Sequence, residues 1–252
     1  MAIGRKLWVS GVAVGVMVGA LTGCGGPKQG EPSGRTLDGQ VAASDSAPAP
    51  AQVAAPKGRE RRILALGDSL LAGYGLRPEQ AYPPRLEAAL RMRGINARVV
   101  NAGVSGDTTE DGRARLAFSL GPKGSEPELV LISLGGNDML RGLPPAKTRE
   151  NLDAILTELD ARHVRAVLLG MVAAPNMGRD YAAAFNPIYA DLARRHHAVL
   201  VPFFLKAVYA RPDLQLPDHI HPTPEGVEAM VKATQGTVVK ALPPEAQGAP
   251  KA

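Results

Sequence analysis

Three residues of this 252-residue chain carry the side chains that acyl transfer needs. Ser69 follows the apolar run Ile63-Leu64-Ala65-Leu66 and a glycine, where the chain must turn sharply and expose a nucleophilic hydroxyl. His221 can take and return the hydroxyl proton near neutral pH. Asp218, three residues earlier, can reach the imidazole on an irregular turn and hold it in the useful tautomer. We therefore predict Ser69 as nucleophile, His221 as base and Asp218 as the residue that orients the base.

The negative charge that develops on the substrate oxygen needs hydrogen-bond donors of its own. The sequence offers the backbone N–H groups of Ser69 and Gly106 and the side-chain amide of Asn137. Each such donor can stabilise the transition state by ~3 kcal/mol. We therefore predict an oxyanion hole formed by these three residues.

Apolar runs and helical patterns alternate five times along the chain after residue 61. The apolar runs are continuous, which is typical of the strands of a parallel sheet covered by helices on both faces. In such a sheet, working residues gather at the carboxyl ends of the strands, so the motifs above are expected at one rim. Strands are expected at 63–66, around 99–100, at 129–134, at 167–169 and around 199–201. Helices are expected at about 82–93, from a capping box at 107–110, and at about 148–162, 181–195 and 224–241.

Four motifs occur in the order of a known family: GDSLLAGYG, NAGVSGDTTEDGRARL, LGGNDMLRGL, and PFFLKAVY followed by IHP. In these motifs the chain resembles the SGNH (GDSL) hydrolases, in particular the bacterial periplasmic acyl thioesterase, lysophospholipase and arylesterase subgroup. The four letters of the name correspond to Ser69, Gly106, Asn137 and His221. The resemblance covers most of residues 61–242 and implies a three-layer α/β/α fold with a flavodoxin-like, five-stranded parallel sheet.

The same resemblance implies hydrolysis of carboxylic esters or thioesters, lysophospholipids included, through a Ser-His-Asp triad and an acyl-enzyme. It implies no metal and no organic cofactor. Two alternatives stay open: an esterase that removes acetyl groups from a cell-wall carbohydrate, and a non-catalytic surface protein that binds its ligand on the same fold.

His219 departs from the family pattern, which has a small residue at this position, and it raises the question of which histidine is the base. Its place directly before a proline and three residues after Asp218 favours His221. The Asp218-His219-Ile220-His221 segment could instead bind zinc, but no further His or Cys ligand is clustered with it.

Structural or substrate-contacting roles, rather than catalytic ones, are expected for several further residues. Asp68 is expected to form local hydrogen bonds around the turn at Ser69. Residues 139–144 resemble a mobile loop that contacts substrate. The remaining histidines, His163, His196 and His197, are expected to be solvated surface residues.

The N-terminal segment indicates export. Arg5 and Lys6 precede an apolar run from Leu7 to about Ala20, which suits a signal peptide and is short for a membrane-spanning helix. Leu21-Thr22-Gly23-Cys24 resembles a lipobox, in which Cys24 would be acylated. We predict a lipoprotein signal peptide (1–23), a flexible Pro/Ala/Gly-rich tether (24–58), a catalytic domain (59–245) and a disordered tail (246–252).

The predicted partners are therefore a small acyl substrate and, through the N-terminal lipid anchor, a membrane. The location expected is the cell envelope, in the periplasm or at the outer membrane. The formal net charge of +5 falls to +3 without Arg5 and Lys6 (5 − 2), and the basic residues are scattered, so no nucleic-acid partner is expected. We expect a monomer.

Overall fold

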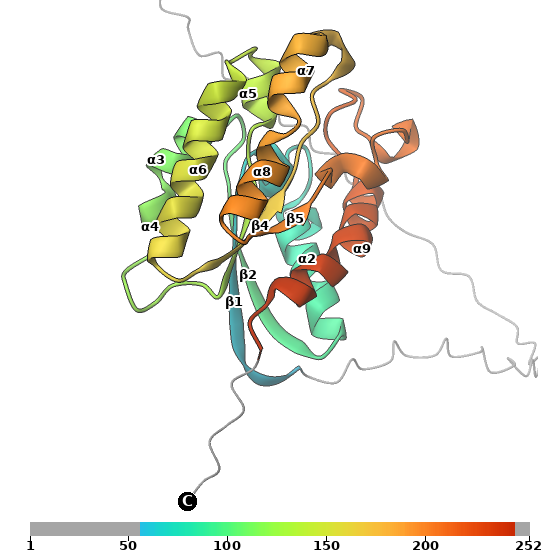
Figure 1. The fold of residues 1–252 in the computed structure, drawn as a ribbon. Helices are drawn as coiled ribbons and strands as arrows, with labels where there is room; N and C mark the ends of the chain where they lie inside the picture. Colours follow the sequence, from blue (N-terminus) through green and yellow to red (C-terminus); the bar gives the residue numbers. More distant parts are fainter. Residues whose placement is uncertain (1–55, 245–252) are drawn as a thin grey trace, which may run out of the picture. The chain divides into compact units, whose positions relative to one another are not determined.

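The computed structural model describes residues 56–244, which form a parallel five-stranded sheet between two layers of helices (Figure 1). The strand order is β2-β1-β3-β4-β5, as in flavodoxin-like sheets, and this confirms the predicted fold class. In this order the chain changes direction across the sheet at β1 and β3, where ligands of such folds bind. The strands are β1 (Lys57–Gly67), β2 (Ile95–Gly103), β3 (Leu129–Ser133), β4 (Arg165–Leu169) and β5 (Val199–Val201).

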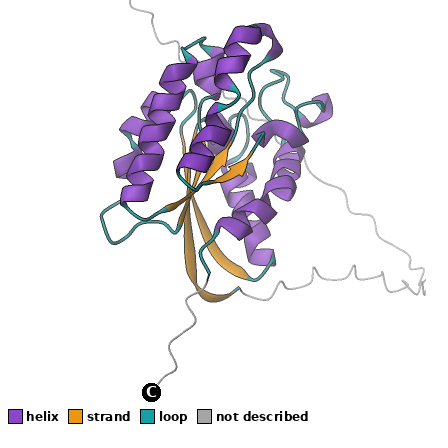
Figure 2. Ribbon diagram, in the orientation of Figure 1, coloured by secondary structure: helices purple, strands orange, loops and turns teal. Residues whose placement is uncertain are grey.

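Helices cover both faces of this sheet (Figure 2). One layer contains α2 (Tyr82–Met92) and α9 (Pro224–Ala241), which pack against each other. The other layer contains α3 (Thr109–Ala114), α4 (Leu116–Leu120), α6 (Pro145–Ala161) and α8 (Ile188–Arg195). Shorter elements occupy the connections: α1 (Ser69–Ala72), α5 (Gly136–Leu140), α7 (Arg179–Phe185) and 3-10 turns at Pro78–Gln80, Pro175–Met177, Phe204–Ala207 and Pro212–Leu214.

The core lies between the sheet and each helical layer. All five residues of β3 are buried, as the continuous apolar run predicts for a central strand. Truncating one of them, such as Leu131 to alanine, is expected to cost ~2–5 kcal/mol of folding free energy. Within residues 56–244, no helix combines the length and apolarity that crossing a bilayer requires.

Strand β1 begins earlier than the sequence indicates, at Lys57, within the last residues predicted as tether. Lys57 pairs with Ile95 of β2, and the Asn96 side chain donates to the Gly58 carbonyl at 3.1 Å. The residues from Lys57 to Arg62 include no apolar side chain, so hydropathy cannot reveal this part of the strand. The long neighbouring strand supplies the pairing instead.

The single helix predicted over residues 181–195 is two helices, because Pro187 interrupts it. Proline lacks the N–H that a continuous helix needs, and α8 starts directly after it. The break has a structural use. The Asn186 side chain accepts a hydrogen bond from the Ala173 N–H at 2.8 Å and so fixes the loop after β4.

The capping box of α3 is real but lies one residue later than predicted. Thr108 is the N-cap, and its backbone N–H donates to the Asp111 carboxylate at 2.9 Å. Asp107, predicted to cap, instead pairs with Arg115 at 2.6 Å. Either residue can cap a helix, so composition alone does not separate them.

Candidate active site

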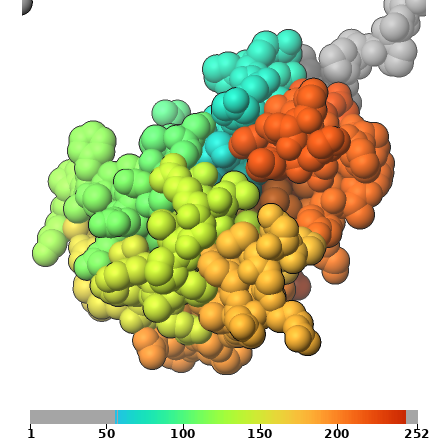
Figure 3. All heavy atoms as spheres, turned by 90° about the horizontal axis from the view of Figure 1, so that it is seen from above, coloured from blue at the N-terminus to red at the C-terminus, as the bar shows by residue number. Residues whose placement is uncertain are grey.

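The structure brings Ser69, His221 and Asp218 together at the carboxyl end of the sheet. Ser69 is the first residue of α1, directly after the turn that ends β1. Its Oγ lies 2.8 Å from Nε2 of His221, and Nδ1 of His221 lies 2.7 Å from Oδ2 of Asp218. Segments far apart in the sequence meet on this face of the molecule (Figure 3). The arrangement can pass a proton from the hydroxyl to the imidazole.

The loop that carries His221 is fixed by its own backbone. The Leu216 N–H donates to the His221 carbonyl at 2.7 Å, and the Thr223 N–H donates to the Leu214 carbonyl at 2.9 Å. His219 adopts a left-handed conformation with φ 57°, which turns the chain between Asp218 and His221. This turn provides the irregular geometry that a three-residue spacing requires.

Asp218 is held in its ionised form. Burial opposes the charge, but the backbone N–H and the ring of His221 and the N–H of Ile220 outweigh it and lower the pKa of Asp218 to about 2. Oδ1 accepts both backbone bonds, from Ile220 at 2.9 Å and from His221 at 3.0 Å. Oδ2 is therefore left to face the imidazole, where a fixed negative charge favours a ring that gains a proton.

The three predicted oxyanion donors lie around the same position. The N–H of Ser69 is at the first position of α1, where no helical carbonyl can accept it. Gly106 is in a turn with φ 90° that favours glycine. One hydrogen of the Asn137 amide goes to the Asp107 carbonyl at 2.9 Å, which fixes the side chain and leaves its second hydrogen available. All three residues line one pocket.

Arg115 supports this region from below and was not identified from the sequence. Its guanidinium donates to the Gly67 carbonyl at 2.9 Å, the Ala102 carbonyl at 2.7 Å and the Asp107 carboxylate at 2.6 Å. It therefore ties the ends of β1 and β2 to the loop that carries Gly106. Arg115 lies within the motif NAGVSGDTTEDGRARL, but the motif does not indicate this role, because two of its three acceptors are backbone carbonyls of other elements.

Asp68 has the local role predicted for it. It is the N-cap of α1 and accepts a hydrogen bond from the Leu70 N–H at 3.0 Å. The residue is buried, and burial together with the Asp107 and Asp138 carboxylates raises its pKa to about 7 despite the Leu70 bond. Its position directly before Ser69 fixes the start of the helix that presents the hydroxyl.

A pocket of about 430 Å³ opens beside Ser69 and His221. Its wall is mainly apolar. Met139 and Leu140 line it, so the loop predicted at residues 139–144 does contact the pocket, although its first two residues end helix α5. The loop after β4 and the segment after β5 complete the wall, and the sequence did not predict this role for either. Their lining residues are Met171, Val172, Ala174, Phe203, Leu205, Val208 and Tyr209.

The structure places His221, rather than His219, between the serine and the aspartate. His219 lines the pocket and forms no side-chain hydrogen bond within residues 56–244. Across this same stretch, no cluster of three or more His, Cys, Asp or Glu side chains is arranged to hold a metal ion.

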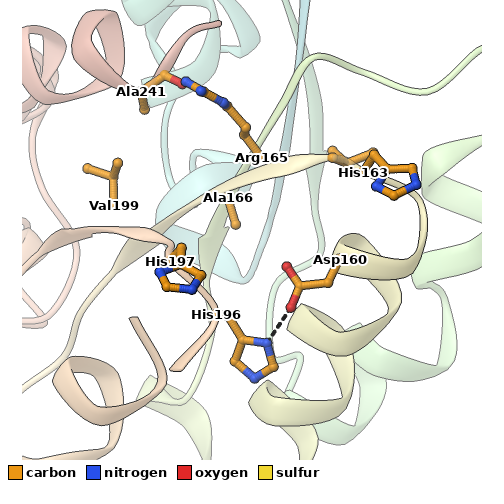
Figure 4. A pocket seen from close by; sticks show the side chains of 9 residues that line it. Asp160, His163, Arg165, Ala166, His196, His197, Val199 and Ala241 are labelled. Carbon is orange, nitrogen blue, oxygen red and sulfur yellow. Dashed lines mark hydrogen bonds and ion pairs between the residues drawn. The ribbon is translucent and has the colours of Figure 1, made fainter. Parts of the chain in front are cut away.

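His196 was predicted as a solvated residue, and this was wrong. Its side chain is only 8% exposed. Nδ1 lies 2.6 Å from Asp160, and Nε2 lies 2.8 Å from Asp153, so the ring bridges two carboxylates of α6. Figure 4 shows the ring turned toward Asp160. His163 and His197 are exposed, as predicted.

The N-terminal predictions fall outside the described residues. These are the signal peptide, the acylated Cys24 and the tether up to residue 55.

Comparison with known proteins shows the family of the chain. A family model described as GDSL-like Lipase/Acylhydrolase matches residues 65–229. An arylesterase of Vibrio mimicus is 38% identical over 181 residues, which cover 72% of this chain and 90% of that protein. The thioesterase 1/protease 1/lysophospholipase L1 of Escherichia coli K12 is 41% identical over 160 residues, which cover 64% of this chain and 74% of that protein.

Solved structures give the same result. AlinE4, a SGNH-hydrolase family esterase, is 55% identical, with a TM-score of 0.63 over 74% of this chain and 99% of that one. Fold, motifs and relatives agree, and the chain belongs to the GDSL-like Lipase/Acylhydrolase family and is a carboxylic ester hydrolase.

Proposed function

We propose that Ser69 is the nucleophile, His221 the general base and Asp218 the residue that orients it. The observation that carries this proposal is the continuous pair of hydrogen bonds from Ser69 through His221 to Asp218, at the mouth of an apolar pocket. Oγ of Ser69 attacks the acyl carbon while its proton passes to Nε2 of His221. The imidazolium then protonates the leaving group, and an acyl-enzyme remains. In the second half of the reaction, His221 takes a proton from the water that attacks the acyl carbon and then gives it to Oγ of Ser69 as the acid leaves.

The oxyanion that forms in each step would be held by the N–H groups of Ser69 and Gly106 and by the Asn137 amide. These donors are already oriented by α1, by the turn at Gly106 and by the bond from Asn137 to the Asp107 carbonyl. Little reorganisation is then needed when charge develops, which is the condition under which such donors contribute most.

Mutation of the nucleophile tests this mechanism. Ser69→Ala should lower kcat by ~10⁴–10⁶ and abolish labelling by a fluorophosphonate probe. Ser125→Ala is a matched control, because Ser125 is exposed in the loop before β3 and should leave both readouts unchanged. A Ser69→Ala protein that keeps more than a few per cent of the activity would refute the assignment. A wild-type protein with no esterase activity would instead favour the non-catalytic binding protein.

The substrate class follows from the wall of the pocket. Apolar side chains such as Met139, Met171 and Phe203 line it. Transfer of an acyl chain or an aromatic ring from water to such a surface is favourable. This supports arylesters, acyl thioesters and lysophospholipids over acetylated sugars, whose hydroxyl groups would need polar partners. The names of the arylesterase and the thioesterase/lysophospholipase relatives point the same way.

A chain-length series decides between these substrates. Rates on p-nitrophenyl esters from acetate to palmitate, beside an acyl-CoA series and a lysophospholipid, should show kcat/KM rising beyond acetate. A maximum at acetate, with release of acetyl groups from a cell-wall polysaccharide, would favour the carbohydrate esterase.

The lipid anchor is a separate part of the proposal. Acylation at Cys24 would attach the protein to a membrane of the cell envelope, as a monomer whose catalytic domain reaches nearby acyl esters. More than one acyl chain is needed for stable anchoring, since each buried CH₂ contributes ~0.8 kcal/mol.

Substitution of the cysteine tests the anchor without touching the site. Cys24→Ser should move the protein from the detergent to the aqueous phase and block palmitate labelling, while activity on soluble esters stays the same. Wild-type protein that is released in soluble form, with an N-terminus other than Cys24, would refute anchoring and leave the esterase assignment intact.

A further inference from the structure

The ring of Tyr74 lies against the ring of His221. The ring centroids are 4.4 Å apart and the planes are tilted by 34°. The tyrosine is 52% exposed and does not belong to the hydrophobic core. Its contact is therefore with the catalytic loop and not with the hydrophobic core.

The backbone holds Tyr74 in this place. Its N–H donates to the Ser69 carbonyl at 3.1 Å, at the end of helix α1. Gly73 before it is left-handed with φ 84°, and a Cβ at Gly73 would come within 2.6 Å of Ala81. Only glycine fits both conditions, so the chain leaves α1 in one direction. The same short segment thus presents the hydroxyl of Ser69 and the ring of Tyr74.

The two hydrogen bonds of His221 do not by themselves prevent its ring from tilting, and Tyr74 can restrict this motion. Bonds to Asp218 and Ser69 lie in the plane of the imidazole and fix its direction. Tilting about the line through its two nitrogens is opposed by the torsions of the histidine side chain and by contacts on the ring faces. The Tyr74 ring supplies such a contact.

An aromatic face also distinguishes the two charge states of the base. The face of a phenol ring carries partial negative charge and attracts a cation placed over it. His221 is neutral before Ser69 attacks and positive afterwards, so this attraction grows as the reaction proceeds. An interaction that is stronger in the transition state raises kcat.

We propose that Tyr74 is a positioning residue, whose ring supports His221 and favours the imidazolium that forms when Ser69 loses its proton. This inference rests on the proposed triad. Among residues 56–244, the other titratable groups around this pocket are Asp218 and His219 on the loop of His221, Asp68 before Ser69, and Tyr209 after β5.

Steady-state kinetics of Tyr74→Leu and Tyr74→Phe on p-nitrophenyl acetate test the proposal, because an acetyl group is too short to report on the pocket wall. Tyr74→Leu should lower kcat about 10-fold with KM within about 2-fold, whereas Tyr74→Phe keeps the aromatic face and should stay within about 2-fold in both. Thermal unfolding of each variant checks that the fold is kept.

Three outcomes would overturn the proposal: full kcat in Tyr74→Leu, equal loss in both variants, or a loss confined to KM. A separate variant distinguishes this failure from failure of the triad. If His221→Ala is inactive and Tyr74→Leu is normal, only the role of Tyr74 is wrong. An active His221→Ala variant would overturn both.

Discussion

Two histidines at opposite ends of the sheet each form hydrogen bonds through both ring nitrogens. One partner of each is a carboxylate, and the other partner differs between them. At the carboxyl end, His221 faces the Asp218 carboxylate and the Ser69 hydroxyl. At the other end, His196 faces two carboxylates, Asp160 and Asp153. A hydroxyl can donate, so a neutral ring satisfies both partners of His221. Ionised carboxylates only accept, so the two partners of His196 favour a ring that carries protons on both nitrogens.

The comparison shows that a histidine next to an aspartate is not by itself a base. The second partner decides whether the ring has a nitrogen free to receive a proton. Burial opposes the charge on His196, but the hydrogen bonds to Asp153 and Asp160 outweigh it and raise its pKa. The two carboxylates therefore favour the protonated ring of His196, which links the end of α8 to α6. In the proposed mechanism, His221 gains its proton only during the reaction.

The largest expected effect separates these two histidines by activity. His221→Ala should lower kcat by ~10⁴–10⁶, since it removes the group that takes the proton. His219→Ala is the matched control on the same loop and should keep most of the activity, as should His196→Gln at the far end of the sheet. Hydrolysis of p-nitrophenyl butyrate measures all three. Equal losses at His219 and His221, with zinc found by elemental analysis, would contradict the comparison and revive a metal site.

A second substitution alters the carboxylate partner and keeps the shape. Asp218→Asn should lower kcat by ~10⁴, because the amide no longer fixes the tautomer or stabilises the imidazolium. The matched variant Asp160→Asn, which changes a carboxylate partner of His196, should leave kcat within about 2-fold because Asp160 is remote from the reacting atoms. Activity retained by Asp218→Asn would mean that this aspartate only shapes the loop.

In the proposed mechanism, the positive charge that forms on His221 is accompanied by a negative charge on the substrate oxygen. Neither charge exists before the reaction, in contrast to the charge that Asp153 and Asp160 favour on His196. Asn137→Ala removes one donor to the negatively charged oxygen and leaves two backbone donors. kcat should fall by ~10²–10³, with KM changing far less. An effect on KM alone would show that Asn137 contacts the substrate before charge develops.

The smallest effect is on stability and depends on pH. The pKa of His196 is raised in the folded state, so its contribution is fully present below the unfolded value and is lost as pH rises through the folded value. His196→Gln should therefore lower the free energy of unfolding by about 1–2 kcal/mol at pH 6 and by less at pH 9. Urea denaturation at both pH values measures this, with the exposed His197→Gln as control. An equal deficit at both values would show that folding does not raise the pKa of His196.

The sequence predicts well those features that depend on local pattern. Strand β5 and helix α9 have the predicted bounds, and β3 and α2 differ by one residue at one end, because continuous apolar runs and helical spacing mark them directly. Ser69, Gly106, Asn137 and His221 are found in motifs at strand ends, and the parallel topology places such ends together.

The features that could not be predicted from the sequence are contacts between side chains and elements that are distant along the chain. His196 reads as a polar residue beside two arginines, and only the packing of α8 on α6 brings Asp153 and Asp160 to its two nitrogens. Those aspartates are seven residues apart, which is two helical turns, so they share one face. Arg115 and Tyr74 lie within the motifs, but the motifs do not indicate which groups they contact, because Gly67 and His221 are distant from them in the sequence.

The hydrogen bond between Ser69 and His221 joins residues 152 positions apart. A ribosome adds ~5–20 residues per second, so the base follows the nucleophile after roughly 8–30 s. Late in this interval the growing chain contains Ser69, Gly106 and Asn137 but not yet His221. In the proposed mechanism, activation of the Ser69 hydroxyl therefore waits until the chain has been made beyond residue 221 and the loop that carries His221 has folded against helix α1.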